Sequence, residues 1–441
     1  MKPNRRDFLK AAAAAGLVLG APAIHGAEKA KKYRTAIIGA GWWGMNILNE
    51  AIAAGESDVI AMCDVDSNQL DPAAASVEKK TGSAPKKYKD YRDMLDKGKP
   101  EICIVATPDH WHPLAMIAAV KAGAHVYVEK PICHTVKEGR AMVKAARDAN
   151  RVVQVGTHRR VSPHNVSGRE FIRSGKAGKI GMVRAFVLYG GGPEKPRKNT
   201  KSPAGVDWDM WCGPAPLRPY NRGIHPRSWR NYLDYANGTL GDWGIHWIDQ
   251  IRWIMDLKAP KRVFSVGGRP IKGEPVLTKE EQTSDAPDHQ LATFQFDGLD
   301  VTWEHRQFAG NNAEKGESVG CYFYGTNGTF HLGWQKGWTF YPANSRDPVV
   351  HEEPQLHPPD DQNIKELWAN FLQCVKTGER PISDIEEGYL SSATALLGML
   401  SMKLGRSVLW DGEKDEIVGD PEASKMLERP YRGPWVYPKV S

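Results

Sequence analysis

The sequence predicts an α/β protein, with a parallel-sheet domain at residues 33–156 and an α+β domain with an open, mostly antiparallel sheet at residues 157–441. Three observations support this prediction. In the first region, short apolar runs alternate with helical patterns, and a glycine motif directly follows the first run. In the second region, segments of alternating polar and apolar residues replace these runs. Such alternation is typical of strands with one solvated face.

The N-terminal residues 1–27 have the features of a signal peptide for the twin-arginine export route. The pair Arg5-Arg6 precedes an apolar stretch over residues 11–23, which ends in small residues suited to peptidase cleavage. Because this stretch is too short to span a bilayer, we expect no membrane association after cleavage. A disordered basic tail is the alternative, but the order of the residues favours the export signal. We therefore predict a periplasmic protein.

The composition excludes several classes of function. Residues 1–27 hold four cations and one carboxylate, so most of the formal net charge of +7 remains as a mild excess in the predicted mature protein. No arginine stripe or lysine block is present, and we expect no nucleic-acid partner. The six cysteines lie far apart without a CxxC motif, which favours buried apolar roles over disulfides or a metal site. We expect no metal cofactor.

The first domain is predicted from its apolar runs in chain order. They are uniformly apolar, as in parallel strands that helices cover on both faces. The predicted strands are residues 35–38, 59–63, 102–106, 125–128 and 152–155. The clearest helical patterns between them span residues 113–122 and 136–150.

A dinucleotide cradle follows the first predicted strand, in the motif Gly39-x-Gly41-x-x-Gly44. Gly39 permits the tight turn out of the strand, Gly41 lets the backbone approach a pyrophosphate, and Gly44 lets the next helix pack close to the sheet. Amides at the start of that helix point at the phosphates. Trp42 and Trp43 lie inside the motif, and we expect them to contact the cofactor as well.

Asp64 lies twenty residues after Gly44, at the end of the second predicted strand. A carboxylate there accepts hydrogen bonds from the adenosine ribose and repels a 2′-phosphate, which favours NAD over NADP. Strand, motif, helix and acidic residue together predict a Rossmann domain that binds NAD. Because nicotinamide cofactors are not freely available outside the cytoplasm, we expect an exported enzyme of this kind to carry its NAD with it and to recycle it.

Two further segments follow predicted strands, at the edge of the sheet where ligands bind. They are the loop from Thr107 to His112 and the turn Glu129-Lys130-Pro131. Together with the glycine motif, they make the chain resemble the glucose-fructose oxidoreductase and inositol dehydrogenase family, also written Gfo/Idh/MocA. The resemblance covers the first domain and continues more loosely into the second. It implies that Thr107, His112, Glu129 and Lys130 belong to the cofactor site.

The resemblance also describes the second domain, as an open, mostly antiparallel sheet that covers the nicotinamide. Family members commonly assemble through this sheet, so we expect a homo-oligomer. The alternating segments consistent with such a sheet are residues 182–188, 262–266, 290–296, 301–307, 320–325 and 328–332. Two closing helices are predicted at residues 361–376 and 385–403.

The segment 238–246 holds the catalytic signal of the second domain. It leads into a predicted helix on which isoleucines recur at a three-residue step. Asp242 and His246 are four residues apart, so they face the same way on a helix. This spacing is similar to the family's Asp-x-x-x-His motif, which implies that Asp242, His246 and Lys130 are catalytic. The structural alternative is that Asp242 caps the helix and His246 is a buried histidine.

These residue types suit the removal of a hydride from a carbinol carbon. A histidine that a carboxylate orients takes up a hydroxyl proton near neutral pH. By the resemblance, Lys130 lies beside the same hydroxyl and stabilises the developing alkoxide. The residues alone leave open whether Lys130 or His246 takes the proton.

Four further residues are candidates for substrate contacts. His158 and Arg159 follow the last predicted strand of the first domain, where family members contact substrate and cofactor, although the family more often has asparagine at the first position. The adjacent Arg160 fits a structural ion pair as well as a ligand. Trp208 and Trp211 suit stacking on a sugar ring, but tryptophan-rich loops are also common in protein cores.

The leading functional prediction is an NAD-dependent oxidoreductase that transfers a hydride at a secondary hydroxyl of a carbohydrate or polyol. One form of it oxidises one sugar and reduces another. In a second form, an NAD-dependent glycosidase or lyase oxidises the sugar transiently, eliminates the aglycone and returns the hydride. A non-catalytic exported sugar-binding protein is an alternative from a different class. The joint presence of Lys130, Asp242 and His246 argues against it.

Overall fold

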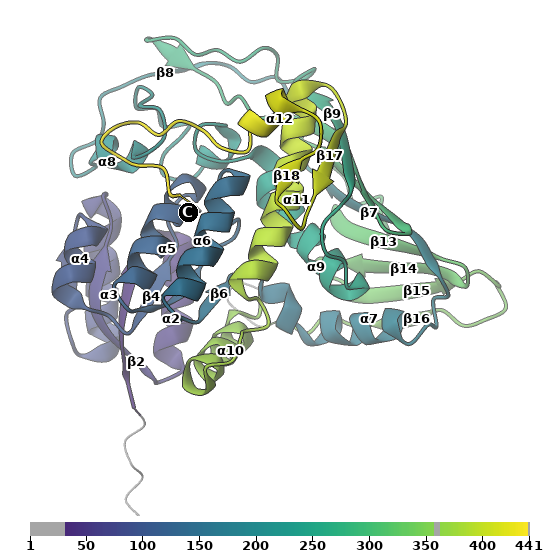
Figure 1. Cartoon of the computed structure of the whole chain (residues 1–441), viewed down its shortest axis with the longest axis horizontal. Helices are drawn as coiled ribbons and strands as arrows, with labels where there is room; N and C mark the ends of the chain where they lie inside the picture. The colour runs from purple at the N-terminus through teal and green to yellow at the C-terminus, as the bar shows by residue number, and fades with distance from the viewer. Residues whose placement is uncertain (1–30, 357–361, 440–441) are drawn as a thin grey trace, which may run out of the picture. The chain divides into compact units, whose positions relative to one another are not determined.

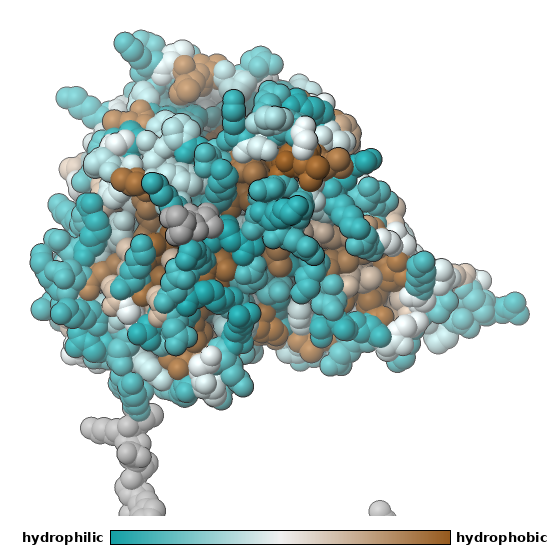
Figure 2. Space-filling view, in the orientation of Figure 1, coloured by the Kyte–Doolittle hydropathy of each residue, from teal (hydrophilic) through white to brown (hydrophobic). Residues whose placement is uncertain are grey.

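The computed structural model describes residues 31–356 and 362–439. The signal peptide predicted at residues 1–27 lies outside these residues. No helix in the described ranges is long and apolar enough to cross a membrane. On the face drawn in Figure 2, hydrophilic side chains cover most of the surface, with smaller apolar areas between them.

The first sheet is the predicted parallel sheet of a Rossmann domain, with strand order β3-β2-β1-β4-β5-β6. Its strands are β1 (Tyr33–Ile38), β2 (Ser57–Cys63), β3 (Lys86–Tyr88), β4 (Ile102–Val105), β5 (His125–Val128) and β6 (Val153–Val155). Its helices are α2 (Trp42–Ala53), α3 (Ser67–Thr81), α4 (Tyr91–Gly98), α5 (His112–Lys121) and α6 (Val136–Asp148). All five predicted strands are confirmed. The strand order reverses between β1 and β4, and in such sheets this point leaves a ligand crevice at the carboxyl ends of the two strands.

The second sheet has ten strands in the order β16-β15-β14-β13-β7-β12-β11-β9-β17-β18. They are β7 (Ile180–Leu188), β9 (Arg262–Gly268), β11 (His289–Phe296), β12 (Leu299–Arg306), β13 (Val319–Gly325), β14 (Gly328–Gly333), β15 (Trp338–Pro342), β16 (Val350–Glu352), β17 (Val408–Asp411) and β18 (Glu416–Ile417). The pairs are antiparallel except β7 with β12, which confirms the predicted mostly antiparallel sheet. Two further strands, β8 (Arg197–Lys198) and β10 (Glu281–Gln282), pair outside it.

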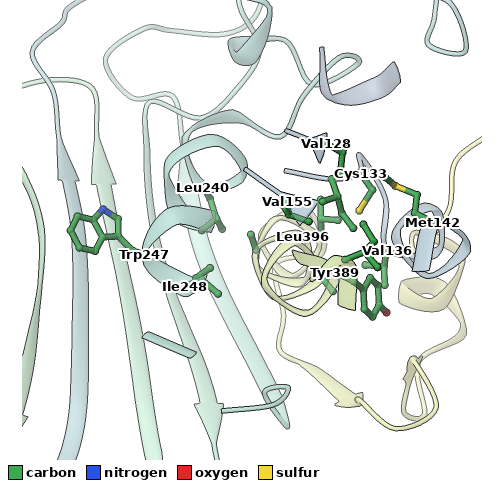
Figure 3. Close-up of a cluster of buried hydrophobic side chains, with 14 of the residues drawn as sticks. Val128, Cys133, Val136, Met142, Val155, Leu240, Trp247, Ile248, Tyr389 and Leu396 are labelled. Carbon is green, nitrogen blue, oxygen red and sulfur yellow. The ribbon is translucent and has the colours of Figure 1, made fainter. Parts of the chain in front are cut away.

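Helix α11 (Ile385–Leu404) joins the two sheets into one core. Its residues are buried on nearly every side along most of its length, as expected of a helix with apolar residues all round. In Figure 3, Leu240 and Ile248 lie on one side of this helix, and Val128 and Val155 of the first sheet lie on the other. Residues 33–441 accordingly form one compact unit. The boundary predicted after residue 156 therefore separates two sheets that share a core.

The second domain has further helices besides α11. They are α7 (Pro163–Arg173), α8 (Trp208–Cys212), α9 (Ile245–Met255), α10 (Ile364–Thr377) and α12 (Pro421–Lys425). Figure 1 shows α11 running between α6 and the second sheet, and it contacts both α6 and α9. Helix α10 packs against α2 of the first domain. Residue 361, where the sequence predicts the start of this helix, lies outside the described residues.

A buried ion-pair network fixes α9 against the end of the first sheet. Arg160 donates two hydrogen bonds of 2.8 Å to the carboxylate of Asp249, and a third of 3.1 Å to Glu387. The hydroxyl of Ser391 on α11 also donates to Asp249 at 2.9 Å. Arg160 is therefore a structural ion-pair partner, which decides the question that the sequence left open.

Replacing Asp249 with alanine should cost the protein about 3–5 kcal/mol in free energy of unfolding, because the buried Arg160 would lose its main partner. Asp148→Ala is the matched control, since Asp148 forms an exposed pair with Lys144. We expect that variant to change stability by about 0.5 kcal/mol or less. Denaturant unfolding of both variants checks this. Equal stability of the two variants would contradict the structural role of Asp249.

Candidate active site

Lys130 and Asp242 form an ion pair between the two domains. Lys130 follows β5, and its ammonium donates to the Asp242 carboxylate at 2.8 Å and to the Asp242 carbonyl at 3.1 Å. The guanidinium of Arg230 donates to the same carboxylate oxygen at 3.1 Å. Burial opposes ionisation of Asp242, but the charges of Lys130 and Arg230 outweigh it and hold the pKa of Asp242 below its ordinary value. Asp242 is therefore an ionised anchor for two cations.

The backbone around Asp242 explains which group its carboxylate reaches. Residues Leu240–Gly244 form a π-helical turn, and α9 begins only at Ile245. A π turn is wider than an α turn, so residues four apart are not stacked as they are on a regular α-helix. The prediction that the Asp242 carboxylate orients His246 is wrong: it accepts from Lys130 and Arg230 instead.

His246 lies in a cage of rings beside this ion pair. The centroid of its imidazole is 5.1 Å from Trp334, 5.4 Å from His158 and 5.7 Å from Trp243. Burial, reinforced by the positive charge of Lys130, holds the pKa of His246 well below its ordinary value. The imidazole is therefore neutral at physiological pH, and a neutral imidazole is able to accept a proton.

His158 and Arg159, at the end of the first domain, contact the same group of rings: His158 lies against His246, and Arg159 lies against Trp334. Both ring nitrogens of His158 are buried and have no hydrogen-bond partner among the described residues. The Arg159 guanidinium lies 3.8 Å from the ring centroid of Trp334, a cation–π contact. Trp334 and Arg230 are site residues that the sequence analysis did not identify. Neither lies in a motif with characteristic spacing, so only the fold brings them to the site.

A cavity of about 410 Å³ lies over the glycine motif and ends at Lys130. The three glycines fit their predicted roles. Gly39 has a φ of +94°, and a Cβ there would lie 2.6 Å from the Ala106 carbonyl. A Cβ on Gly44 would meet the Gly39 carbonyl at 2.1 Å, whereas one on Gly41 would meet nothing within 4 Å. The space at Gly41 is therefore free for a pyrophosphate at the N-terminus of α2.

Asp64 lines this cavity at the end of β2, as predicted. Its carboxylate accepts from the amides of Ala40 at 2.8 Å and Asp66 at 2.9 Å. These contacts tie the glycine loop to β2 and leave lone pairs for ribose hydroxyls. Burial raises the pKa of Asp64 to about 6. The residues present fit NAD, since Asp64 and the glycine motif line one cavity with Lys130.

Other predicted cofactor residues line the same cavity, although some of them support its wall. The ring nitrogens of His112 lie 2.7 Å from the carbonyls of Thr107 and Pro131, so both face protein atoms. Glu129 is buried, and burial raises its pKa to about 7. Its carboxylate accepts from the Lys130 amide at 3.2 Å. These groups hold the two loops in place.

The two tryptophans of the glycine motif differ in exposure. Trp42 is 64% exposed, and its ring centroid lies 5.3 Å from that of Trp43. Trp43 in turn lies 6.4 Å from His158, so it connects the glycine motif to the ring cage. Both tryptophans line the cavity, and their contact with the cofactor stays a prediction.

Trp208 and Trp211 stack on each other, with ring centroids 4.6 Å apart and an interplanar angle of 9°. Trp211 is buried, and the indole nitrogen of Trp208 donates to the Arg218 carbonyl at 2.7 Å. Trp211 borders the cofactor cavity, and neither tryptophan borders the second cavity described next. The structure therefore favours the core role over the predicted stacking on a sugar ring.

A second cavity of about 700 Å³ lies on the other side of the ion pair. Lys130 borders the first cavity, Asp242 borders the second, and Arg230 borders both. Polar side chains dominate the second cavity, among them Glu194, Thr239, Lys272 and Gln307. Hydroxylated ligands suit such a lining. No group of three metal-ligating side chains occurs among residues 31–356 and 362–439.

Known protein families match most of the chain. Residues 33–157 match the oxidoreductase family with an NAD-binding Rossmann fold, written Gfo/Idh/MocA. Residues 181–267 and 325–437 match the C-terminal alpha/beta domain of the same oxidoreductase family. Residues 2–22 match the twin-arginine translocation pathway signal sequence.

Individual relatives are more distant. A "Glycosyl hydrolase family 109 protein" of Parabacteroides distasonis is 26% identical over 294 residues, which are 60% of this chain and 60% of that protein. The chain thus spans less than two thirds of that relative. D-glucoside 3-dehydrogenase of Escherichia coli is 24% identical over 81% of this chain and 92% of its own. A levoglucosan dehydrogenase solved with NADH and levoglucosan has a TM-score of 0.66 at 20% identity, covering 86% of this chain and 99% of its own.

Asp64→Ala should weaken NAD binding by about tenfold or more, because charge-assisted hydrogen bonds to the ribose are lost. It should also weaken discrimination against NADP, because the repelling charge is removed. Since the pKa of Asp64 is about 6, discrimination by the unaltered protein should fall as the pH drops below 6, where the carboxyl is protonated. Calorimetric titration with both cofactors, on either side of that pH, measures these effects.

Asp71→Ala is the control for this test, because Asp71 lies on α3 in an exposed pair with Lys87. It should bind both cofactors as the unaltered protein does. A preference of the unaltered protein for NADP would show that Asp64 does not read the ribose.

Proposed function

Because the chain belongs to the Gfo/Idh/MocA oxidoreductase family, we propose that it is an NAD-dependent oxidoreductase that transfers a hydride at a secondary hydroxyl of a carbohydrate or polyol. The observation that carries this proposal is the ion pair of Lys130 and Asp242 at the boundary of two cavities. The cavity over the glycine motif fits the dinucleotide. The polar cavity beyond Asp242 fits the substrate.

The side chains at this boundary divide the work of the reaction. NAD, when bound, accepts the hydride from the carbinol carbon. Lys130 donates a hydrogen bond to the substrate oxygen and stabilises the negative charge that develops there. Asp242 holds the ammonium in place, and the neutral His246 takes the hydroxyl proton. We assign the proton to His246 because its neutral imidazole offers a free electron pair, whereas the Lys130 side chain already donates to the carboxylate and the carbonyl of Asp242.

Export favours a reaction that regenerates its cofactor. The chain carries a twin-arginine signal, and that route moves folded proteins, so NAD loaded in the cytoplasm travels with the protein. Outside the cytoplasm, an acceptor must take the hydride before the next turnover. A sugar acceptor does this in an oxidoreductase that couples two sugars.

A glycosidase that oxidises its substrate transiently is the second candidate. The match to a glycosyl hydrolase family 109 protein favours it. In that reaction the hydride returns to the same sugar after the aglycone leaves, so no second substrate is needed. Release of nitrophenol from nitrophenyl glycosides without added NAD distinguishes this candidate from net oxidation. A non-catalytic sugar-binding protein fits less well, because it has no need of a lysine paired with an ionised carboxylate between two cavities, with a neutral histidine nearby.

Assembly into a homo-oligomer stays a prediction. Large apolar side chains are exposed on neighbouring strands of the second sheet, among them Met182 on β7, Phe264 and Val266 on β9, and Leu291 on β11. Their exposed fractions range from 38% for Met182 to 51% for Leu291. Association of this sheet with a second copy would remove these side chains from water.

His246→Ala and Lys130→Ala should each lower the turnover rate by on the order of a hundredfold or more, because each removes a group that acts on the substrate hydroxyl. NAD content should stay close to that of the unaltered protein. Asp242→Asn should have a smaller effect, since it keeps the size of the side chain and removes only the charge that holds Lys130. Turnover of sugars and the cofactor absorbance of the purified protein measure both properties.

Two controls match these variants. Lys97→Ala removes an exposed lysine that pairs with Asp93, and His351→Ala removes a half-exposed histidine that contacts Glu353. Both controls should turn over at the normal rate. Near-normal rates for His246→Ala and Lys130→Ala would overturn the assignment of these two residues.

A further inference from the structure

One segment of the second domain, residues 203–230, closes the cofactor cavity from outside. It begins after β8, contains α8 and ends at Arg230, whose guanidinium contacts Asp242. Met210, Trp211 and Arg227 from this segment line the same cavity as the glycine motif. The cavity therefore has a Rossmann wall and a second-domain wall.

The segment is fastened to the residues that directly follow Asp64. The Asp207 amide donates to the Val65 carbonyl at 2.9 Å, and the Ser67 amide donates to the Gly205 carbonyl at 2.9 Å. The side-chain amide of Asn68 donates to the Ala204 carbonyl at 2.9 Å. His225 lies 3.5 Å from the carboxylate of Asp66. In a Rossmann domain this edge of the sheet holds the adenosine ribose, so the segment lies over the adenosine end.

A second set of contacts fastens the segment to the loop after β4. The indole nitrogen of Trp111 donates to the Trp211 carbonyl at 2.9 Å, and a ring nitrogen of His110 lies 2.9 Å from the same carbonyl. Trp111 also lines the cavity. The loop after β2 and the loop after β4, which both line the cavity, are thus both bonded to this one segment.

The C-terminal tail holds the segment from its other side. Arg432 donates to the Asp209 carboxylate at 2.8 Å and to the Gly213 carbonyl at 3.1 Å. The ring of Trp435 packs edge-on against Trp111 at 4.7 Å. In Figure 1 the tail, drawn in yellow, passes beside α8 before it ends near α5 and α6.

We propose that residues 203–230 retain the cofactor: they close the adenosine end of the NAD site, and Arg227 binds the pyrophosphate. This inference rests on the proposed function, which requires a resident NAD. Arg227 is exposed, lines both the cofactor cavity and the polar cavity, and forms no ion pair with a described residue. A guanidinium there complements the phosphates that the N-terminus of α2 attracts.

Residues 203–230 slow the release of NAD because they must detach before NAD leaves. NAD leaves its site only after the segment detaches from the residues that follow Asp64 and from the loop after β4 that holds Trp111. A substitution that removes one of these contacts should therefore raise the rate of NAD release, even where the altered residue does not touch the cofactor. The free energy of these contacts thus acts on the dissociation rate of NAD.

The test measures exchange of bound NAD in the full-length exported protein. Protein purified with its own NAD is mixed with excess radiolabelled NAD, and the label that stays with the protein after gel filtration is followed in time. Asn68→Ala removes the hydrogen bond to the Ala204 carbonyl, and Arg432→Ala removes the one to the Asp209 carboxylate. Both bonds lie outside the cavity, and we expect about fivefold faster exchange for each variant. Arg227→Gln should exchange about tenfold faster or more, with a weaker salt dependence of NAD binding.

Lys80→Ala is the matched control, since Lys80 lies on the same helix as Asn68 but bonds to Asn49. It should exchange NAD at the normal rate. Exchange at the normal rate in Asn68→Ala, Arg432→Ala and Arg227→Gln would overturn the retention role, even if the enzyme turns over sugars. Slow exchange that these variants accelerate, in a protein that transfers no hydride, would support retention while the proposed function fails.

Trypsin gives a readout that is independent of exchange. Arg222 and Arg227 are exposed in the segment. Added NAD should slow cleavage after these two arginines in protein stripped of its cofactor, and should slow it less in Asn68→Ala. Cleavage that NAD leaves unchanged would contradict closure of this segment over the cofactor.

Discussion

The ion pair of Lys130 and Asp242 is the interaction on which the site depends. It joins a turn of the parallel sheet to a π-helical turn that lies 112 residues further along the chain. A buried pair of charges is stable only when its geometry is held closely, because desolvation of both groups opposes it. The shared core around α11 and the network of Arg160 with Asp249 supply this rigidity. The contact therefore fixes where the cofactor cavity ends and the polar cavity begins.

Local sequence patterns predict much of the first domain, because each of its elements has its own signal. Apolar runs give the strands, and the glycines with Asp64 give the cofactor site. Strand β3 is missed because Lys86–Tyr88 is short and polar. In the second domain, β11 is predicted because buried and exposed residues alternate along it. Short edge strands such as β17 and β18 have too few residues to show a pattern.

Site residues that lie in a sequence motif are predicted, whereas those that only the fold brings to the site are missed. Lys130, Asp242 and His246 lie in motifs, but the π turn redirects the Asp242 carboxylate in a way that residue spacing does not show. Arg230 and Trp334 come from loops without a pattern. Trp208 and Trp211 show the opposite error, since their composition suggests a sugar site while their rings cover each other.

The central claim is that a carbohydrate delivers a hydride to NAD that the protein already holds. Its most direct test incubates the purified protein, without added cofactor, with glycosides and polyols that carry deuterium at each secondary carbinol carbon in turn. Mass spectrometry of the cofactor released on denaturation then reports the transfer. The account predicts deuterium in the nicotinamide ring from one carbinol position. Bound cofactor that stays free of deuterium, while the same carbohydrates are converted, would contradict it.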